Sequence, residues 1–330
     1  MKEILIIRWK SIGDVVFTLP AVNCIRANFP EARLTFLVSR ENAFVVEGFS
    51  AIDQIWTIDR ALLRGSRFLQ GIGSLAKLLI RIRRQRFSLV VDLQGYGETA
   101  VISRLSGANE RWGRAARGLR SRAYTHRHAP DHRLHPAEDH LNLLANAGLK
   151  SGPTENHYRL DASDRASARA FLESRGIRRS SPLVYLQPFT SAEWKNWPLD
   201  LHLQVAALLQ AAGVQVIFGG GPGDRESLRD SGVDCRLIVD GIPRRTDIAL
   251  LDCADLVVGG DTGFLHLAVA LKKHVLLLGR RSAVTPLGHP EQTILSSGPL
   301  LDSIRVEEVL QKIGKILQIQ CDALAPDKIS

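Results

Sequence analysis

The sequence predicts an α/β protein built from two doubly wound parallel sheets. Three observations lead to this fold class. The chain has 330 residues, more than one hydrophobic core usually supports. Short aliphatic runs alternate with helical stretches, which is typical of parallel strands covered by helices on both faces. Its 45% hydrophobic and 23% charged residues are the balance of a soluble globular protein. We therefore expect two Rossmann-like domains facing across a cleft.

The expected elements follow from the apolar runs and the breakers between them. In the first half we expect strands at residues 4–7, 34–38, 54–58 and 89–92, and a helix at 15–27. In the second half we expect strands at 183–187, 214–218, 236–239, 256–259 and 275–278, and a helix at 225–230. A polar helix at 163–174 and a breaker run at 178–182 lie between the halves. An amphipathic helix at 304–319 closes the fold.

These elements imply a division into domains. We predict a first domain at residues 1–160, a linker region at 161–181 and a second domain at 182–303. The closing helix occupies 304–320, and residues 321–330 form a tail.

The cysteines and the amino terminus bear on the compartment. Four cysteines are scattered without the close spacing of a metal or redox motif, which fits a reducing cytoplasm. The apolar run before Arg8 is too short for a signal peptide. No run reaches the roughly 18 apolar residues of a membrane span. We expect a cytoplasmic protein.

The positive charge is unevenly distributed. Residues 1–150 contain 23 Lys and Arg against 13 Asp and Glu, whereas the rest contains 20 against 21. Such a field attracts phosphorylated or carboxylated partners, anionic lipid surfaces or nucleic acid. Any single arginine can equally lie on a solvated face. The arginine-rich stretches lack interleaved aromatic residues, which argues against single-stranded nucleic acid.

Ligands of open α/β sheets bind beyond the carboxyl ends of the strands, so we expect the functional residues in the loops there. The first loop, residues 10–14, ends in Asp14 at the start of a helix. Asp14 is either a helix cap or a general base that takes a proton from an acceptor hydroxyl. Spacing alone favours the cap.

The second loop, residues 187–198, carries Thr190, Ser191 and Lys195. Two hydroxyls and an ammonium group can hold a diphosphate. The same segment can also be a structural turn that starts the next helix, and the two interpretations are compatible.

The third loop, residues 219–224, is rich in glycine but lacks the GxGxxG fingerprint, so it supports a dinucleotide site only weakly. Asp224 at its end can accept hydrogen bonds from ribose hydroxyls or cap the following helix.

The fourth loop, residues 259–266, runs from a strand into an apolar helix. Free N–H groups at a helix start suit a phosphate, which makes Thr262 and Gly263 candidate contacts. Asp261 would repel a phosphate, so we expect it to contact sugar hydroxyls or to cap the helix. His266 can donate to a leaving diphosphate or be a packed core histidine.

Four segments in this order resemble the ADP-heptose:lipopolysaccharide heptosyltransferases, glycosyltransferase family 9. They are SIGDVVFTLPAV at 11–22, VVDLQG at 90–95, PFTSAEWKNWP at 188–198 and GGDTGFLHLA at 259–268. The resemblance extends from residue 4 to about residue 317.

The resemblance implies a GT-B fold, in which the first domain holds the acceptor and the second holds the nucleotide sugar. It implies an inverting transfer in a single displacement. The residues it assigns are Asp14 as catalytic base, Thr190, Ser191, Lys195, Thr262, Gly263 and His266 as diphosphate ligands, Asp261 as donor-sugar contact, and Asp224 near the ribose.

The substrates implied are ADP-heptose and an anionic glycolipid of the lipopolysaccharide inner core, with a Kdo or heptose acceptor. Arg60, Gln94, Arg111 and Arg114 are the candidate acceptor contacts. We expect a monomer that is peripheral on the inner face of the cytoplasmic membrane, needs no cofactor or metal ion and binds no nucleic acid.

Two departures from the family pattern stand out. The loop after residues 275–278 reads GRRSAVTP instead of a Gly-Pro-Thr type turn, and residues 8–10 are bulkier than usual. The alternatives are a GT-B transferase or epimerase using another nucleotide sugar, and a nucleotide- or nucleic-acid-binding module.

Overall fold

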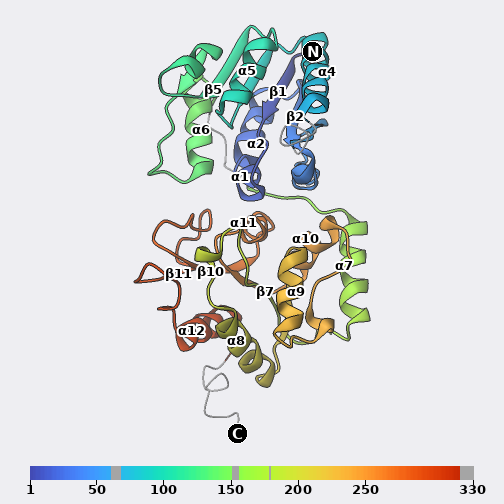
Figure 1. Ribbon diagram of the computed structural model, residues 1–330, viewed down its shortest axis with the longest axis vertical. Helices are drawn as coiled ribbons and strands as arrows, with labels where there is room; N and C mark the ends of the chain where they lie inside the picture. The colour runs from blue at the N-terminus through green and yellow to red at the C-terminus, as the bar shows by residue number, and fades with distance from the viewer. Residues whose placement is uncertain (61–67, 151–155, 178–179, 320–330) are drawn as a thin grey trace. The chain divides into compact units, whose positions relative to one another are not determined.

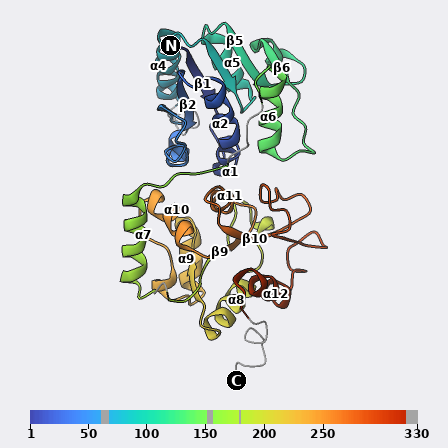
Figure 2. The same cartoon turned by 180° about the vertical axis from the view of Figure 1, so that it is seen from behind.

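A computed structural model describes residues 1–60, 68–150, 156–177 and 180–319. The chain divides into two compact units, Met1–Arg159 and Leu160–Ser330. Each contains one parallel sheet with helices packed on it (Figures 1 and 2). The predicted fold class of two doubly wound parallel sheets is therefore confirmed.

The sheet of the first unit has the strand order β3-β2-β1-β4-β5-β6, and every pair in it is parallel. Its strands are β1 (Glu3–Ile7), β2 (Arg33–Ser39), β3 (Gln54–Ile58), β4 (Leu89–Asp92), β5 (Glu110–Arg114) and β6 (His126–His128). The first four match the predicted strands. Strands β5 and β6 were not predicted from the sequence, because their arginines and histidines conceal any apolar run.

The helices of the first unit are α1 (Ile12–Val16), α2 (Leu19–Asn28), α3 (Ala43–Val46), α4 (Phe68–Gln85), α5 (Gly97–Leu105) and α6 (Pro136–Asn146), with short 3-10 turns η1 (Arg40–Asn42) and η4 (Leu119–Ala123). The single helix predicted at 15–27 is in fact α1 and α2. Thr18 is the N-cap of α2, and Pro20 lies in its first turn, where a missing N–H costs nothing.

The sheet of the second unit has the order β11-β10-β9-β7-β8. Its strands are β7 (Leu183–Gln187), β8 (Gln215–Phe218), β9 (Leu256–Gly259), β10 (His274–Gly279) and β11 (Thr293–Leu295). Its helices are α7 (Ala162–Ser174), α8 (Leu199–Ala211), α9 (Pro222–Asp230), α10 (Arg244–Cys253), α11 (Gly263–Ala270) and α12 (Val306–Leu317), with turns η5 (Glu193–Lys195) and η6 (Cys235–Leu237). Helix α7, inside the predicted linker region, packs against α10.

The strand predicted at 236–239 is wrong. Cys235–Leu237 form the turn η6, because Asp234 accepts a hydrogen bond from the Arg236 N–H at 2.8 Å and closes the turn. Only Ile238 then pairs with Phe218, as an isolated parallel bridge. The short strand β11 was missed, and the predicted tail at 321–330 lies outside the described residues.

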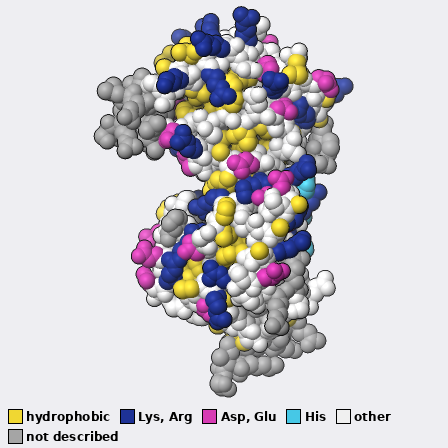
Figure 3. Space-filling view, turned by 90° about the vertical axis from the view of Figure 1, so that its right-hand side faces the viewer, with side chains coloured by type: hydrophobic (Ala, Val, Ile, Leu, Met, Phe, Trp, Pro, Cys, Tyr) yellow, Lys and Arg dark blue, Asp and Glu magenta, His cyan; other side chains and the backbone are white. Residues whose placement is uncertain are grey.

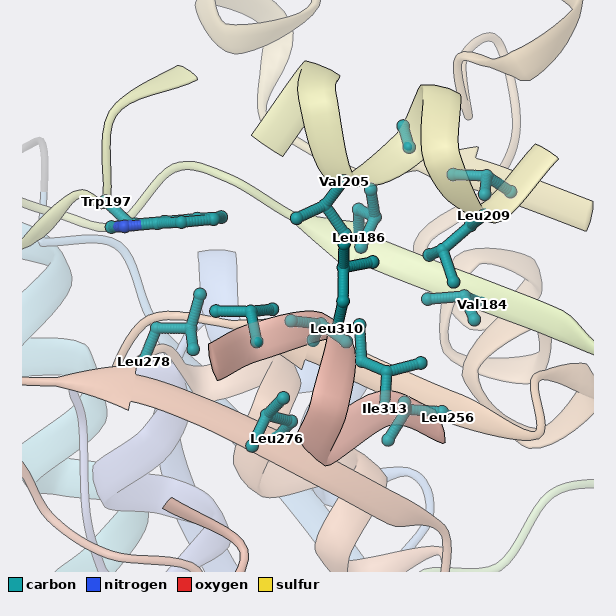
Figure 4. Close-up of a cluster of buried hydrophobic side chains, with 14 of the residues drawn as sticks. Val184, Leu186, Trp197, Val205, Leu209, Leu256, Leu276, Leu278, Leu310 and Ile313 are labelled. Carbon is teal, nitrogen blue, oxygen red and sulfur yellow. The ribbon is translucent and has the colours of Figure 1, made fainter. Parts of the chain in front are cut away.

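The core of the second unit shows why its helices form. Alternate side chains of β7, such as Val184 and Leu186, point to one face of the sheet, where side chains of α8 and α12 meet them (Figure 4). Tyr185 points to the other face and reaches α10. Full burial of one such aliphatic side chain contributes roughly 1.5–3 kcal/mol. This packing holds the strand ends, and therefore the loops that follow them, in fixed positions.

Candidate functional site

Asp14 lies in the first turn of α1, just beyond the carboxyl end of β1. Ser11 is the N-cap of α1, and Asp14 is its third helical residue. Oδ2 of Asp14 accepts a hydrogen bond from the Ser11 N–H at 2.9 Å, as the third residue of a capping box does. Its Oδ1 lies 2.9 Å from Nη2 of Arg8. The Asp14 side chain is still 37% exposed. The cap and the reactive carboxylate are therefore compatible roles for this residue.

Arg8 joins the loops that follow β1 and β4. Its guanidinium is buried, and Nη1 donates to the Leu93 carbonyl at 2.6 Å while Nη2 contacts Asp14. The Trp9 N–H donates to Oε1 of Gln94 at 3.0 Å, which is a second link between the same loops. This bridging position of Arg8 was not predicted from the sequence, where Arg8 stood out only as a bulky departure from the family pattern. An arginine directly after a buried strand is the signal that could have indicated it.

The buried carboxylate of Asp92 holds the turn of the VVDLQG segment in place. It accepts hydrogen bonds from the Tyr124 hydroxyl at 2.6 Å and from the Gln94 and Gly95 N–H groups at 2.9 Å. Burial raises the pKa of Asp92, and these hydrogen bonds oppose the rise. The carboxylate thus fixes the backbone that carries Gln94 at the end of β4.

Gly95 completes this turn. It has a φ of +70°, and a Cβ atom there would lie 2.3 Å from the Arg114 carbonyl oxygen. Both facts require glycine.

The four candidate acceptor contacts occupy different surroundings. Gln94 and Arg114 follow or end strands β4 and β5 at the carboxyl edge of the sheet. Arg114 forms an ion pair with Asp139 at 2.6 Å. Burial lowers the pKa of Arg114, and the nearby Asp139 carboxylate opposes this. The charge of Arg8 lowers the pKa of Arg114 further, whereas the charge of Asp14 raises it. The structure therefore brings Gln94 and Arg114 close to the Asp14 loop.

Arg60 and Arg111 lie elsewhere in the first unit. Arg60 follows the edge strand β3, with Nη1 3.9 Å from a carboxylate oxygen of Glu41. Arg111 is the second residue of β5, and its side chain donates to the backbone carbonyls of Ala108 and Ala123. Arg111 therefore braces the loops around β5.

The loop after β7 is an ordered turn. The Thr190 N–H donates to Oδ1 of Asn196 at 2.8 Å, and the Thr190 hydroxyl donates to the Ala192 carbonyl at 2.9 Å. Ser191 is exposed. Trp197 is buried and donates from Nε1 to the Ile304 carbonyl at 3.0 Å, which anchors the end of the turn. This turn leads directly into α8, as the structural interpretation of the sequence predicted.

Asp261 connects three segments at the carboxyl ends of β7, β9 and β10. Its Oδ1 lies 2.9 Å from Nε2 of the buried His266, and its Oδ2 lies 3.8 Å from Nζ of Lys195. The Val284 N–H approaches Oδ2 at 3.4 Å. Burial would raise the pKa of Asp261, but His266, Lys195 and the Val284 N–H together lower it. Asp261 is an ionised carboxylate that positions a histidine and a lysine.

The start of α11 lies in the same region. Thr262 is the N-cap, and its hydroxyl accepts from the Leu265 N–H at 3.2 Å. Gly263 is the first helical residue. A Cβ atom at Gly260 would lie 2.6 Å from Cγ2 of Thr190, so a glycine there lets the loops after β7 and β9 approach closely.

A pocket of about 140 Å³ opens between these loops. It is lined by Trp194, Lys195, Asp261, Gly279, Arg280, Ser282 and Ala283. The Arg280 guanidinium lies 4.9 Å and the Lys195 ammonium 5.3 Å from the centre of the Trp194 ring. Neither Trp194 nor Arg280 was predicted from the sequence as a site residue, although Arg280 directly follows β10. Two cations and an aromatic face around one cavity suit an anionic ligand with a planar or sugar part.

The glycine-rich turn after β8 has a packing role. A Cβ atom at Gly219 would lie 1.9 Å from the Tyr185 hydroxyl oxygen. Asp224 accepts from the Gly221 N–H at 2.8 Å and so caps α9. The contact with the Gly221 N–H is the one expected for the helix-cap alternative of Asp224.

Within the described ranges, no three His, Cys, Asp or Glu side chains are grouped so that they could hold a metal ion. No helix in the part of the chain that the structure describes is both long and apolar enough to span a bilayer.

Comparisons with known proteins point in one direction. Lipopolysaccharide heptosyltransferase 3 of Escherichia coli K12 is 24% identical over an alignment of 277 residues that covers 81% of this chain and 79% of that protein. A glycosyltransferase family 9 structure from Veillonella parvula superposes with a TM-score of 0.83 at 20% identity, covering 96% of this chain and 97% of the other.

The E. coli heptosyltransferase WaaC with ADP-2-deoxy-2-fluoro heptose superposes with a TM-score of 0.77 at 21% identity, covering 95% of this chain and 99% of that one. The family model for glycosyltransferase family 9 (heptosyltransferase) matches residues 75–298, which include most of the second unit and the second half of the first. The chain therefore belongs to glycosyltransferase family 9 and is a glycosyltransferase.

Proposed function

We propose that this enzyme transfers a heptose from ADP-heptose to the inner core of lipopolysaccharide, at a Kdo or heptose acceptor, with inversion at the anomeric carbon. The observation that carries the proposal is the Asp14 carboxylate. It is held by Arg8 and Ser11 at the carboxyl edge of a parallel sheet, yet it remains partly exposed. The family membership and the names of the relatives support the choice of donor and acceptor.

In the proposed reaction, Asp14 takes the proton of an acceptor hydroxyl as its oxygen bonds to the anomeric carbon. The bond between that carbon and the diphosphate oxygen breaks, and ADP leaves with the electron pair. Gln94 suits an acceptor contact, because no described group accepts a hydrogen bond from its buried Nε2. Arg114, which also lies close to the Asp14 loop, is the other acceptor contact proposed. Arg60 and Arg111 hold contacts elsewhere in the first unit and are left out of this proposal.

The second unit holds the donor in this proposal. Lys195 and the N–H groups at the start of α11 stabilise the charge that develops on the departing diphosphate. Thr190, Ser191 and His266 complete the diphosphate site, Asp261 contacts the donor sugar, and Asp224 lies near the ribose.

The decisive experiment is turnover of ADP-heptose with a delipidated Kdo acceptor, comparing the parent chain with Asp14→Asn. We expect Asp14→Asn to lower kcat by about 10²–10⁴-fold, the usual contribution of a general base. The matched control is Asp200→Asn, an exposed aspartate in the first turn of α8. Equal turnover by Asp14→Asn and the parent would remove Asp14 from the mechanism.

The donor is tested separately by thermal shift with ADP, UDP and GDP. We expect stabilisation by ADP above that by the other two. Stabilisation by UDP alone would replace ADP-heptose with a UDP sugar. We further propose that the enzyme is a monomer that works at the inner face of the cytoplasmic membrane without a metal ion.

A further inference from the structure

Nearly all of the net positive charge of the chain comes from one stretch of the first unit. Residues 73–123 contain 11 Lys and Arg against 3 Asp and Glu, in a chain whose net charge is +9. One of the three acids, Asp92, is fully buried. This stretch includes most of α4, all of α5 and the turn η4.

Helices α4 and α5 cover the same face of the sheet. Leu78 and Ile82 of α4 and Ile102 of α5 share one hydrophobic cluster with Leu5 and Ile7 of β1. The opposite sides of both helices therefore face away from the sheet on the same side of the unit. The turn η4 packs against α5 and extends this surface.

Large aliphatic side chains are exposed on this surface. Ile80 is 52% exposed, Val101 54%, Leu105 48% and Leu119 80%. Val101 and Leu105 are four residues apart on α5, so they lie on one side of that helix. We call the surface formed by α4, α5 and η4 the α4–α5–η4 face. Figure 3 shows Lys and Arg side chains beside exposed hydrophobic ones on the unit that carries α4.

An arginine-rich pocket lies beside one of these four residues, Leu105. It has a volume of about 690 Å³, and Arg83, Arg84 and Arg86 line it together with Ser106 and Gly107. Nη1 of Arg83 donates to the Leu105 carbonyl at 3.3 Å, which joins the pocket to the exposed end of α5. Guanidinium groups bind phosphate oxygens well, so the pocket suits phosphate headgroups.

The exposed aliphatic side chains and the arginine-rich pocket together suit an anionic bilayer surface. Aliphatic side chains gain free energy by entering the headgroup and acyl boundary of a bilayer, and nearby arginines are attracted to anionic lipids. Single-stranded nucleic acid would favour exposed aromatic rings, whereas these four side chains are aliphatic. We propose that the α4–α5–η4 face docks on a bilayer that carries anionic phospholipid headgroups. This inference rests on the proposed function, because a glycolipid acceptor lies in such a bilayer, and it adds the surface that makes the contact.

The test is co-sedimentation of the purified full-length chain with vesicles, without any sugar substrate. Vesicles of phosphatidylcholine alone are compared with vesicles that also contain phosphatidylglycerol, at low and high salt. We expect binding to the anionic vesicles that weakens with salt. Arg83→Gln, Arg84→Gln and Arg86→Gln should each weaken it about fivefold at low salt, since each arginine contributes about 1 kcal/mol near an anionic surface.

A second variant tests the aliphatic part. The triple change Val101→Ser, Leu105→Ser and Leu119→Ser should lower binding by at least about tenfold. The matched control is Leu295→Ser with Leu300→Ser, which are exposed to a similar degree in the second unit. Circular dichroism spectra and melting temperatures show whether each variant is folded.

Three results would overturn the proposal: no binding to anionic vesicles at low salt, equal loss in the control and the triple variant, or displacement from vesicles by duplex DNA at equal phosphate concentration. Because no substrate is present, these results are independent of heptose transfer. Turnover with the delipidated acceptor should stay unchanged in the triple variant. Loss of vesicle binding with normal turnover leaves the proposed function intact.

Discussion

Replacing Asp247 by asparagine should stabilise the second unit, and increasingly so as the pH rises. Asp247 lies buried on α10, where the Tyr185 hydroxyl donates to its Oδ1 at 2.8 Å and Arg244 lies 3.7 Å away. Burial raises the pKa of Asp247 from its ordinary value of 3.8 to about 6, and Tyr185 and Arg244 only partly oppose the rise. Asparagine keeps the acceptor for Tyr185 and carries no charge.

The sign follows from proton binding. An aspartate whose pKa is raised in the folded chain binds more protons when folded, so its favourable contribution is present in acid and is lost as the pH rises through about 6. The full shift corresponds to about 3 kcal/mol. We therefore expect Asp247→Asn to exceed the parent by about 1.5 kcal/mol at pH 5 and about 3 kcal/mol at pH 8.

Another buried group changes in the opposite direction. Burial lowers the pKa of His202 from 6.5 to about 4. The parent and Asp247→Asn therefore both lose stability as the pH falls below 6.5. This contribution cancels in the difference between Asp247→Asn and the parent.

The measurement is hydrogen exchange of the β7 amides during urea unfolding at pH 5, 6, 7 and 8, which reports the second unit alone. The control Asp302→Asn, at an exposed aspartate, should leave the difference from the parent independent of pH. An advantage of Asp247→Asn that stays constant or shrinks with rising pH would refute the argument from burial.

Three further predictions concern the pocket beside Arg280, the turn after β4 and the need for a metal ion. Arg280→Gln should raise KM for ADP-heptose by about tenfold with a smaller change in kcat, because a charged hydrogen bond to the donor contributes about 1.5–3 kcal/mol. Steady-state kinetics check this, with Arg281→Gln as the control variant. Equal effects of the two substitutions would contradict the prediction. Gly95→Ala should lower the melting temperature, because residue 95 has a φ of +70° and the added Cβ would lie 2.3 Å from the Arg114 carbonyl oxygen. Gly97→Ala, whose added Cβ would meet nothing within 4 Å, should not lower it, and equal melting temperatures would be inconsistent with a required glycine at position 95. Turnover should survive EDTA treatment followed by gel filtration, and recovery only on adding Mg²⁺ would show that a metal ion is needed.

Strands with continuous apolar runs were predictable from sequence. Four strands of the first unit and four of the second lie where aliphatic residues follow one another, because a parallel strand is buried on both faces. Strands β5 and β6 could not be found this way, since ERWGR and HRH contain charged residues that the strand pairing itself accommodates. The strand expected at 236–239 failed because a local contact, that of Asp234 with Arg236, competed with the sheet.

The candidate site shows the same division. Its loops were predictable, since ligands of parallel sheets lie beyond the strand ends, and the four motifs stand there. Whether Asp14 caps a helix or faces solvent could not be decided from spacing. The structure shows that one oxygen does the first while the side chain remains partly exposed. Arg8 and Arg280 were missed because their roles depend on neighbours distant in the chain.

The sequence by itself determined the fold class, most strand positions and the loops that carry chemistry, because burial pattern and chain order are local properties that residue types record directly. Only the tertiary structure decided which distant groups meet: Arg8 with the Leu93 carbonyl, Asp261 with Lys195, and Trp194 with Arg280. The physical reason is that such contacts depend on strand order and register, which bring together loops that lie many residues apart in the chain.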